Sequence, residues 1–296
     1  MSRKSIAIYS RKFIPGSIDS LKKIVKKIED NGYKVLLHRG IFDTVIPKIH
    51  FSENPYPFSC KDDLLFHNTK MLFSIGGDGS ILDSVRIVDD SNIPVLGFNF
   101  GRMGFLSMVK KDKIDDILDE LFLGKYEIEE RTLVNIRTSD NLFKDNNYGL
   151  NEVSFQRNGP NSMLSVKVWV DDLYLNKYWG DGLIIATPTG STAYSLSCGG
   201  PILVPEVKSF VLSPISSHNL TVGSIVIPEN SIIRLIVECR EENFSVNIDS
   251  NSACFKSGSE FIISKNRFNF NLIRPNCINF FNTIREKLNW GIDIRN

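Results

Sequence analysis

The sequence of 296 residues lacks a strong excess of either charge, with 35 basic and 34 acidic side chains and a formal net charge of +1. Proteins that grip nucleic acid by its phosphates usually carry a clear basic excess, so we expect no nucleic-acid partner. Neither a signal peptide nor an apolar run long enough to span a bilayer is present. The sequence therefore predicts a cytoplasmic protein without a membrane partner.

Cysteine and histidine are too few and too scattered to predict a metal site. The five cysteines are an odd number without Cys-x-x-Cys spacing, which is typical of free thiols in a reducing compartment. The four histidines form neither a metal-binding pattern nor a triad, and His218 is explained equally well by a structural role in a loop. The sequence also lacks Gly-x-x-x-x-Gly-Lys-Ser/Thr, which excludes a P-loop.

What the chain does contain is a short apolar run that ends in three glycines around one carboxylate, Gly76-Gly77-Asp78-Gly79. Apolar residues return at helical spacing afterwards, which predicts a strand, a tight turn and a helix. Because glycine lets a ligand approach the backbone and a helix start favours an anion, Gly76, Gly77 and Gly79 are candidate phosphate-binding residues. A carboxylate beside a phosphate suits metal binding or proton abstraction from a hydroxyl, so Asp78 indicates phosphoryl transfer. The alternative is a plain strand-to-helix connection.

The first 130 residues alternate strand-like and helix-like segments. Strands are predicted at 5–9 and 33–37, with a helix at 21–28 between them, and this order predicts a parallel sheet with a right-handed crossover. The stretch 51–60, with two prolines close together, predicts an exposed loop.

A second glycine-rich loop, at 97–106, follows another predicted strand. Loops after neighbouring parallel strands meet at the carboxyl edge of the sheet, where open sheets bind their ligands, so this loop and the first glycine turn should lie together. Short alternating runs replace helical spacing after Arg131, which predicts a second domain of mostly antiparallel strands.

Two more segments need a chemical explanation: Asn151-Glu152, and the stretch 180–197. In the second, a buried-type strand runs into a turn of Thr, Pro, Gly and Ser and then into a helix-compatible segment that includes Tyr194. Hydroxyls, backbone N–H groups and an aromatic ring at one point suit a nucleotide, and Asp181 could accept hydrogen bonds from it. The alternative is a Ser/Thr-capped helix after a proline turn.

Together these segments resemble the NAD kinase family, in its order and spacing, over about residues 70–228. The glycine turn is shared with diacylglycerol and sphingosine kinases, whereas the last segment is specific. The matching segments are Gly76-Gly77-Asp78-Gly79-Ser80, Asn99-x-Gly101-x-x-Gly104-Phe105-Leu106, Asn151-Glu152, Gly180-Asp181-Gly182 and Thr187-Pro188-Thr189-Gly190-Ser191-Thr192-Ala193-Tyr194.

The resemblance implies a phosphotransferase with an alcohol group as acceptor. The γ-phosphoryl group of ATP or another nucleoside triphosphate, accompanied by Mg²⁺ or another divalent cation, would pass to the 2′-hydroxyl of the adenosine ribose of NAD and give NADP. Asp78 would orient or deprotonate that hydroxyl, while Gly76, Gly77 and Gly79 would help hold phosphates. The residues implied to bind NAD are Gly79, Asn151, Glu152, Asp181, Thr189, Thr192, Ala193, Tyr194 and Ser197.

Within that implied NAD site, Asn151 and Glu152 would hold the adenosine part. The residues lining the same pocket would be Thr192, Ala193 and Tyr194. Those on the nicotinamide riboside side would be Asp181, Thr189 and Ser197.

For the fold, the resemblance implies a Rossmann-like parallel α/β domain over 1–130 and an antiparallel β-sandwich domain over 131–267. The segment from about 268 to 296 would return to the first domain, and the protein would form a homodimer or homotetramer. The chain departs from the family at Gly223-Ser224, where Arg-Pro is frequent, and at Asp249-Ser250-Asn251, where Asp-Gly-Gln is common.

Two rival functions remain in view. A diacylglycerol-type lipid kinase would explain the glycine turn but not Asn151-Glu152 or the block at 187–194, and no amphipathic membrane-binding helix is evident. A non-catalytic dinucleotide sensor would keep the pocket and lose turnover. An altered Asp78 would be the sign of such a sensor, and Asp78 is intact.

Overall fold

The computed structural model separates the chain into two units that alternate along the sequence. Unit 1 is Met1–Glu130 with Phe270–Asn296, and unit 2 is Arg131–Asn269. The structure describes residues 3–14, 16–101, 104–140, 142–144, 146–159, 163–219 and 221–291. Arg102, the basic residue of the second glycine-rich loop, lies outside the described residues.

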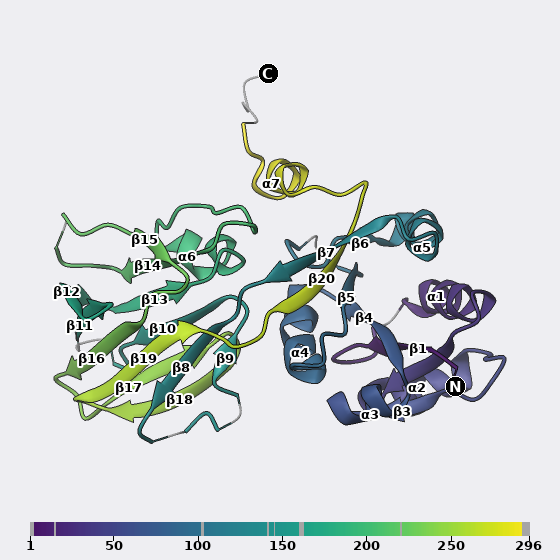
Figure 1. Ribbon diagram of the computed structural model, residues 1–296, viewed down its shortest axis with the longest axis horizontal. Coiled ribbons are helices and arrows are strands. Elements are labelled where there is room, and N and C mark those ends of the chain that lie inside the picture. Colours follow the sequence, from purple (N-terminus) through teal and green to yellow (C-terminus); the bar gives the residue numbers. More distant parts are fainter. Residues whose placement is uncertain are drawn as a thin grey trace. The chain divides into compact units, whose positions relative to one another are not determined.

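Unit 1 is built on a sheet with the strand order β3-β2-β1-β4-β5-β20-β7, to which β6 adds by pairing with β5 (Figure 1). Strands β3, β2, β1, β4 and β5 pair in parallel, which confirms the Rossmann-like sheet. The order reverses between β1 and β4, the place where open parallel sheets bind ligands. The strands are β1 (Ser5–Tyr9), β2 (Lys34–His38), β3 (Tyr56–Phe58), β4 (Thr69–Gly76), β5 (Val95–Asn99), β6 (Val109–Lys110), β7 (Tyr126–Arg131) and β20 (Phe270–Pro275).

The helices of unit 1 follow the apolar spacing of the sequence. In the first, Leu21, Ile24, Val25 and Ile28 are all buried, and the chain leaves the helix at Gly32 with a φ of +80°. No helix among the described residues has both the length and the apolar composition needed to cross a bilayer. The helices are α1 (Ile18–Asp30), α2 (Arg39–Val45), η1 (Ile46–Lys48), α3 (Lys61–Phe66), α4 (Asp78–Val88), η2 (Lys111–Lys113), α5 (Ile114–Phe122) and α7 (Phe280–Leu288).

The prediction of a loop over 51–60 was wrong for its second half. Residues Tyr56–Phe58 form β3, the edge strand beside β2, with Pro57 opposite Leu37. An edge strand tolerates proline because one side of it needs no backbone N–H. Phe58 is fully buried, and burial of an aromatic side chain stabilises the strand.

The C-terminal segment returns to unit 1, as the sequence resemblance implied. Strand β20 lies between β5 and β7 and pairs in parallel with β5, with Leu272 opposite Val95. Leu272 and Ile273 are buried, so apolar contact holds the returning strand in place. Helix α7 then begins at Phe280, and the side chain of the preceding Asn279 caps it by accepting the Asn282 N–H at 2.9 Å.

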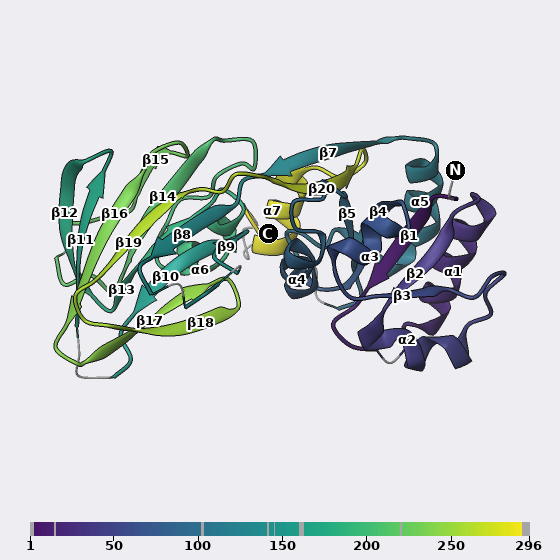
Figure 2. The ribbon, with the colours of Figure 1, turned by 60° about the horizontal axis from the view of Figure 1, so that its bottom comes forward.

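Unit 2 consists of two antiparallel six-stranded sheets, which confirms the predicted β-sandwich (Figure 2). Their orders are β15-β14-β13-β10-β17-β18 and β12-β11-β16-β19-β8-β9. The elements are β8 (Val134–Thr138), β9 (Tyr148–Gly149), β10 (Glu152–Gln156), β11 (Leu164–Val170), β12 (Leu173–Gly180), β13 (Gly182–Ala186), η3 (Gly190–Thr192), α6 (Tyr194–Ser197), β14 (Ser209–Ile215), β15 (Ile225–Pro228), β16 (Ile233–Cys239), β17 (Asn243–Ile248), β18 (Asn251–Lys256) and β19 (Ser259–Lys265).

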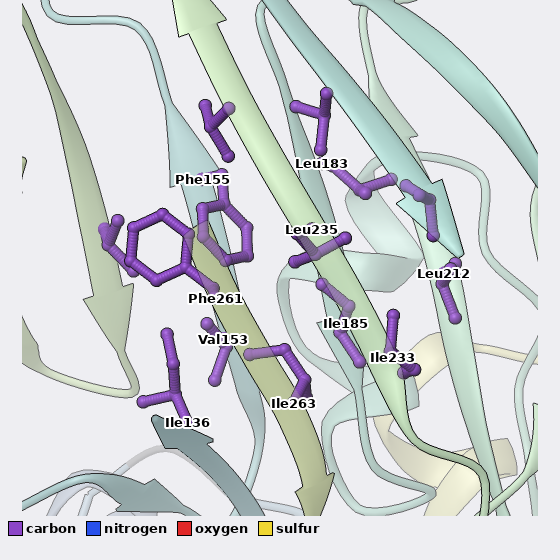
Figure 3. Close-up of a cluster of buried hydrophobic side chains, with 14 of the residues drawn as sticks. Ile136, Val153, Phe155, Leu183, Ile185, Leu212, Ile233, Leu235, Phe261 and Ile263 are labelled. Atoms are coloured by element: carbon purple, nitrogen blue, oxygen red, sulfur yellow. The ribbon is translucent and has the colours of Figure 1, made fainter. Parts of the chain in front are cut away.

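The core of unit 2 lies between its two sheets (Figure 3). Phe155 of β10 and Phe261 of β19 come from different sheets, and their rings meet edge to face with centroids 5.0 Å apart. Val153 and Ile185 of one sheet and Ile263 of the other extend this core. The central strands β10 and β13 are thereby anchored in the core, and the polar segments Asn151-Glu152 and 187–194 lie at their ends.

Candidate active site

The first glycine turn connects β4 to α4, as predicted, with Asp78 as the first helical residue. Gly76 has a φ of +153°, and a Cβ added there would lie 2.2 Å from the Ser80 hydroxyl oxygen, so only glycine fits. A Cβ at Gly77 would meet nothing within 4 Å. The backbone of the turn is therefore open to a ligand at the start of an 11-residue helix, where an anion is favoured.

Asp78 joins the two glycine-rich loops. Its Oδ2 accepts the Phe105 N–H at 2.8 Å, and its Oδ1 accepts the Leu106 and Ser107 N–H groups at 3.1 and 2.9 Å. A Cβ at Gly104 would lie 1.7 Å from Oδ1, so this glycine is what allows the second loop to wrap the carboxylate. The predicted meeting of the two loops is confirmed for their described residues.

Arg11, at the end of β1, is a residue that the sequence analysis missed. Its guanidinium pairs with Asp83 of α4 through Nε at 2.6 Å and Nη2 at 2.7 Å, and Nη2 also donates to the Gly79 carbonyl at 3.3 Å. The Tyr9 hydroxyl donates to the same carboxylate at 2.8 Å, and burial together with this bond raises the pKa of Tyr9. A basic residue directly after the first parallel strand is the signal that could have found it.

In unit 2, the Asn151-Glu152 segment is held by a second carboxylate. Asp249, in the turn between β17 and β18, accepts the N–H groups of Leu150, Asn151 and Glu152 at 2.7, 2.9 and 3.1 Å. The sequence identified Asp249 only as part of an unusual turn, and the structure shows that it fixes this backbone. Three N–H groups on one ionised carboxylate are strong, charge-assisted hydrogen bonds.

The turn after β13 lies against the same segment. The Asn151 carbonyl accepts the Thr187 N–H at 2.9 Å, and the Thr187 hydroxyl donates to the Leu150 carbonyl at 2.6 Å. A Cβ at Gly190 would lie 2.1 Å from the Asn151 oxygen, so the close approach of the two backbones requires glycine. The structure thus brings together two of the segments that the sequence singled out.

Glu152 is a half-buried acid without a complete set of partners. Burial raises the pKa of Glu152 to about 8, and the neighbouring Asp249 carboxylate raises it as well. Its Oε2 is buried and has no hydrogen-bond partner. A buried polar atom of this kind is costly unless a ligand or water completes its bonding, so Glu152 is suited to bind a hydroxyl or amino group.

Asp181 and Tyr194 lie in the same neighbourhood as Glu152. Burial raises the pKa of Tyr194, and negative charge on Asp181 and Glu152 raises it further. Tyr194 is 37% exposed, so a ligand can reach this residue. Asp181 is also ion-paired, since its Oδ1 accepts a hydrogen bond from the Arg157 Nε at 2.6 Å, a partner that the sequence analysis did not identify.

Hydroxyls of the Thr-Pro-Thr-Gly-Ser-Thr block already have hydrogen-bond partners within the protein. Thr189 Oγ1 accepts from the buried Arg131 at 3.5 Å, and the Thr192 hydroxyl donates to the Thr189 carbonyl at 3.2 Å. Ala193 precedes the four-residue helix α6, and Ser197 is exposed at its end. Further hydroxyls with internal partners are Thr187, Ser191 and Ser195.

The described residues contain no group of three or more His, Cys, Asp or Glu side chains placed to hold a metal ion. Chemically, unit 1 offers an open helix start beside a carboxylate, which suits a phosphate and a hydroxyl. Unit 2 offers an acid with one buried, unpartnered oxygen near an exposed tyrosine, which suits a nucleoside.

Comparison with known sequences gives matches along both units. A model described as the ATP-NAD kinase N-terminal domain matches residues 17–126, and one described as the ATP-NAD kinase C-terminal domain matches residues 150–275. The NAD kinase of Cytophaga hutchinsonii is 35% identical over 291 residues, covering 98% of this chain and 99% of the relative. That of Flavobacterium psychrophilum is 38% identical over 293 residues, with the same coverage of 98% and 99%.

Solved structures are similar over almost the whole chain. Yeast NADH kinase complexed with NADH has a TM-score of 0.87 at 21% identity, covering 100% of this chain and 90% of that one. An NAD kinase from Archaeoglobus fulgidus in complex with ATP has a TM-score of 0.70 at 22% identity, covering 97% of each chain. At these identities the likeness shows the shared fold.

Proposed function

The chain belongs to the NAD kinase family, and we propose that it transfers the γ-phosphoryl group of ATP to the 2′-hydroxyl of the adenosine ribose of NAD, giving NADP and ADP. The observation that carries this proposal is the position of Asp78. Its carboxylate lies at the first residue of α4, between two glycine-rich loops and beside an open turn. A base next to a phosphate-binding backbone is what phosphoryl transfer to a hydroxyl requires.

Asp78 acts as the base through Oδ2. Oδ1 already accepts two backbone N–H groups, whereas Oδ2 accepts one and has a lone pair left for the ribose hydroxyl. As the hydroxyl oxygen forms its bond to the γ-phosphorus, its proton passes to Oδ2 and the bond from phosphorus to the β,γ-bridging oxygen breaks. ADP leaves with that electron pair. General base catalysis of this kind is worth about 10²–10⁴ in rate.

The backbone of Gly76, Gly77 and Gly79 supports the phosphates at the start of α4. Mg²⁺ or another divalent cation enters with ATP as part of the substrate and neutralises charge on the phosphates. The backbone at Gly77 leaves room for a phosphate group, because no neighbouring atom lies within 4 Å of where a Cβ would stand.

The NAD pocket is assigned to unit 2. Asn151 and Glu152 hold the adenosine part, and the unpartnered Glu152 Oε2 is the acceptor that a hydroxyl or amino group would satisfy. Tyr194 is assigned to the same pocket, and the charges of Asp181 and Glu152 are near enough to contribute to the raised pKa of its hydroxyl. The remaining residues assigned to this pocket in unit 2 are Asp181, Thr189, Thr192, Ala193 and Ser197, and Gly79 is a separate proposed NAD-binding residue in unit 1.

Binding of NAD should release a proton from Glu152 at pH 7. With a pKa of about 8 the free carboxyl is mostly protonated at that pH, and hydrogen-bond donors of the ligand favour its ionised form and lower its pKa. Calorimetric titrations in buffers of different ionisation enthalpy measure the number of protons released. We expect Glu152→Gln to abolish the release, and a wild-type heat independent of buffer would contradict the assignment.

The experiment that tests the function is a coupled assay for NADP formed from NAD, Mg²⁺ and ATP. Formation of NADP at the rate of ADP release supports the kinase. Binding of NAD by a folded protein that forms no NADP would instead support the dinucleotide sensor.

We also propose that the protein works in the cytoplasm as a homodimer or homotetramer. Strand β12 is the edge of its sheet and exposes three large apolar side chains: Leu173, Tyr174 and Trp179 are 75%, 58% and 52% exposed. Exposed apolar edges of this kind favour association with another chain. Light scattering coupled to gel filtration measures the mass of the assembly, and a monomer at micromolar concentration would contradict this proposal.

A further inference from the structure

The C-terminal helix α7 places a cation beside the proposed base. Lys287, in the last turn of α7, has its Nζ 3.6 Å from Asp78 Oδ2 and 4.6 Å from the centroid of the Phe105 ring. The helix lies outside both family matches, at 17–126 and 150–275. Lys287 thus lies outside both matched domains and outside the motif segments quoted from the sequence.

The ammonium group stands at the oxygen that the reaction needs. Asp78 Oδ1 accepts the N–H groups of Leu106 and Ser107. Lys287 lies instead beside Oδ2, which accepts only the Phe105 N–H among the backbone groups described. A hydroxyl bound to Oδ2 would lie about 2.7 Å from it. The hydroxyl and the Lys287 ammonium would therefore both be neighbours of Asp78 Oδ2.

We propose that Lys287 is a catalytic residue of the phosphoryl transfer, whose ammonium donates a hydrogen bond to a non-bridging oxygen of the γ-phosphoryl group as that group passes to the hydroxyl at Asp78. This inference rests on the proposed kinase activity. The phosphorus bonds to the hydroxyl oxygen that Oδ2 holds, so its other oxygens come within reach of an ammonium 3.6 Å from Oδ2. A lysine side chain with three donors on a flexible stem can turn from the carboxylate to the phosphoryl oxygen without moving the helix.

The charge balance favours this role. The transferring phosphoryl group carries negative charge on three oxygens, and enzymes of this kind place a lysine, an arginine or a metal ion there. The chain has no P-loop lysine, and the guanidinium of Arg11 is already bound at both Nε and Nη2 by Asp83. The side chain of Lys287 is 30% exposed, so one side of it faces solvent and a ligand can reach it.

A purely structural role for Lys287 is poorly supported, because α7 has other contacts that hold it. Glu286 pairs with Lys110 at 2.8 Å, and the Phe280 ring lies 6.4 Å from the Phe105 ring. Ion pairs as exposed as Lys287 with Asp78 contribute little to stability. Loss of Lys287 should therefore leave the fold intact.

The test measures kcat, the KM for ATP, the dissociation constant for NAD and the melting temperature. We expect Lys287→Gln to lower kcat by about 10²–10³, the usual effect of removing one donor to transition-state charge. Because the contact forms in the transition state, kcat/KM for ATP should fall by about the same factor. NAD affinity and melting temperature should not change, and Lys287→Arg should recover most of the lost rate by restoring the cation.

Lys110→Gln is the matched control, since it removes a different ion pair of α7. We expect it to keep the wild-type kcat. Wild-type turnover in Lys287→Gln, or an equal loss in Lys110→Gln accompanied by a lower melting temperature, would overturn the proposal for Lys287 and leave the kinase activity standing. A wild type that forms no NADP would overturn the kinase activity itself, and the role of Lys287 with it.

Discussion

Asp78→Asn should lower turnover by about 10²–10⁴-fold, the contribution of a general base. The amide has nearly the volume of the carboxylate but cannot take a proton. With its oxygen at the Oδ1 position it still accepts the Leu106 and Ser107 N–H groups, while its NH₂ faces the Phe105 N–H. The fold should survive at a cost of about 1–3 kcal/mol for that one lost acceptor.

Initial rates of NADP formation at saturating NAD and MgATP check this prediction, with NAD affinity measured separately. Affinity should stay within about three-fold, since the assigned NAD contacts of unit 2 are untouched. Asp115→Asn is a suitable control because Asp115 pairs with Lys23 on the surface, at 2.7 Å, and should not alter the rate. Unchanged turnover in Asp78→Asn would rule out Asp78 as the base.

Asp249→Ala should destabilise the protein by roughly 2–4 kcal/mol and weaken NAD binding as well. The change removes the acceptor of three N–H groups, those of Leu150, Asn151 and Glu152. The backbone that presents Asn151 and Glu152 would then lose its anchor. Calorimetric unfolding and titration with NAD measure the two effects.

Asp171→Ala provides the matched control for this prediction. Asp171 has the same φ of +49° as Asp249, but its carboxylate accepts one backbone N–H, that of Ile232 at 2.8 Å. Its loss should cost no more than about 1 kcal/mol and leave NAD affinity unchanged. Equal losses in the two variants would mean that Asp249 supports only its own turn.

The sequence predicted the features that depend on neighbouring residues. The strand, turn and helix around Asp78 were predicted correctly because three glycines and an apolar run lie within a dozen positions. The NAD kinase resemblance and the two-part fold that it implied are confirmed by the family matches and the topology. The roles of the assigned site residues stay predictions.

Contacts between distant residues could not be predicted in this way. Arg11, Asp249 and Lys287 each reach a motif from a far part of the chain, and the residues next to each of them do not show which motif it contacts. Their places depend on strand order and on the return of the C-terminal segment, which spacing alone does not determine. The sequence contains 69 charged residues, and the partner of any one of them is not determined until the fold is known.

The hydroxyl-rich turn shows a different limit. A Thr or Ser hydroxyl can serve a ligand or close a turn with equal chemistry, and the sequence does not distinguish the two. In the structure Thr187 and Ser191 bond to the carbonyls of Leu150 and Pro188, so they shape the turn. The density of hydroxyls thus indicated this segment, but several of these hydroxyls stabilise the turn and are not free to bind a ligand.

The position of β20 has a consequence for how the protein is made. A ribosome synthesises β5 and β7 early, yet the strand that lies between them begins only at Phe270. All of unit 2 is therefore synthesised before the sheet of unit 1 can close. The nascent chain must carry an incomplete sheet with an open edge until its last strand emerges, and during that interval it should depend most on protection from aggregation.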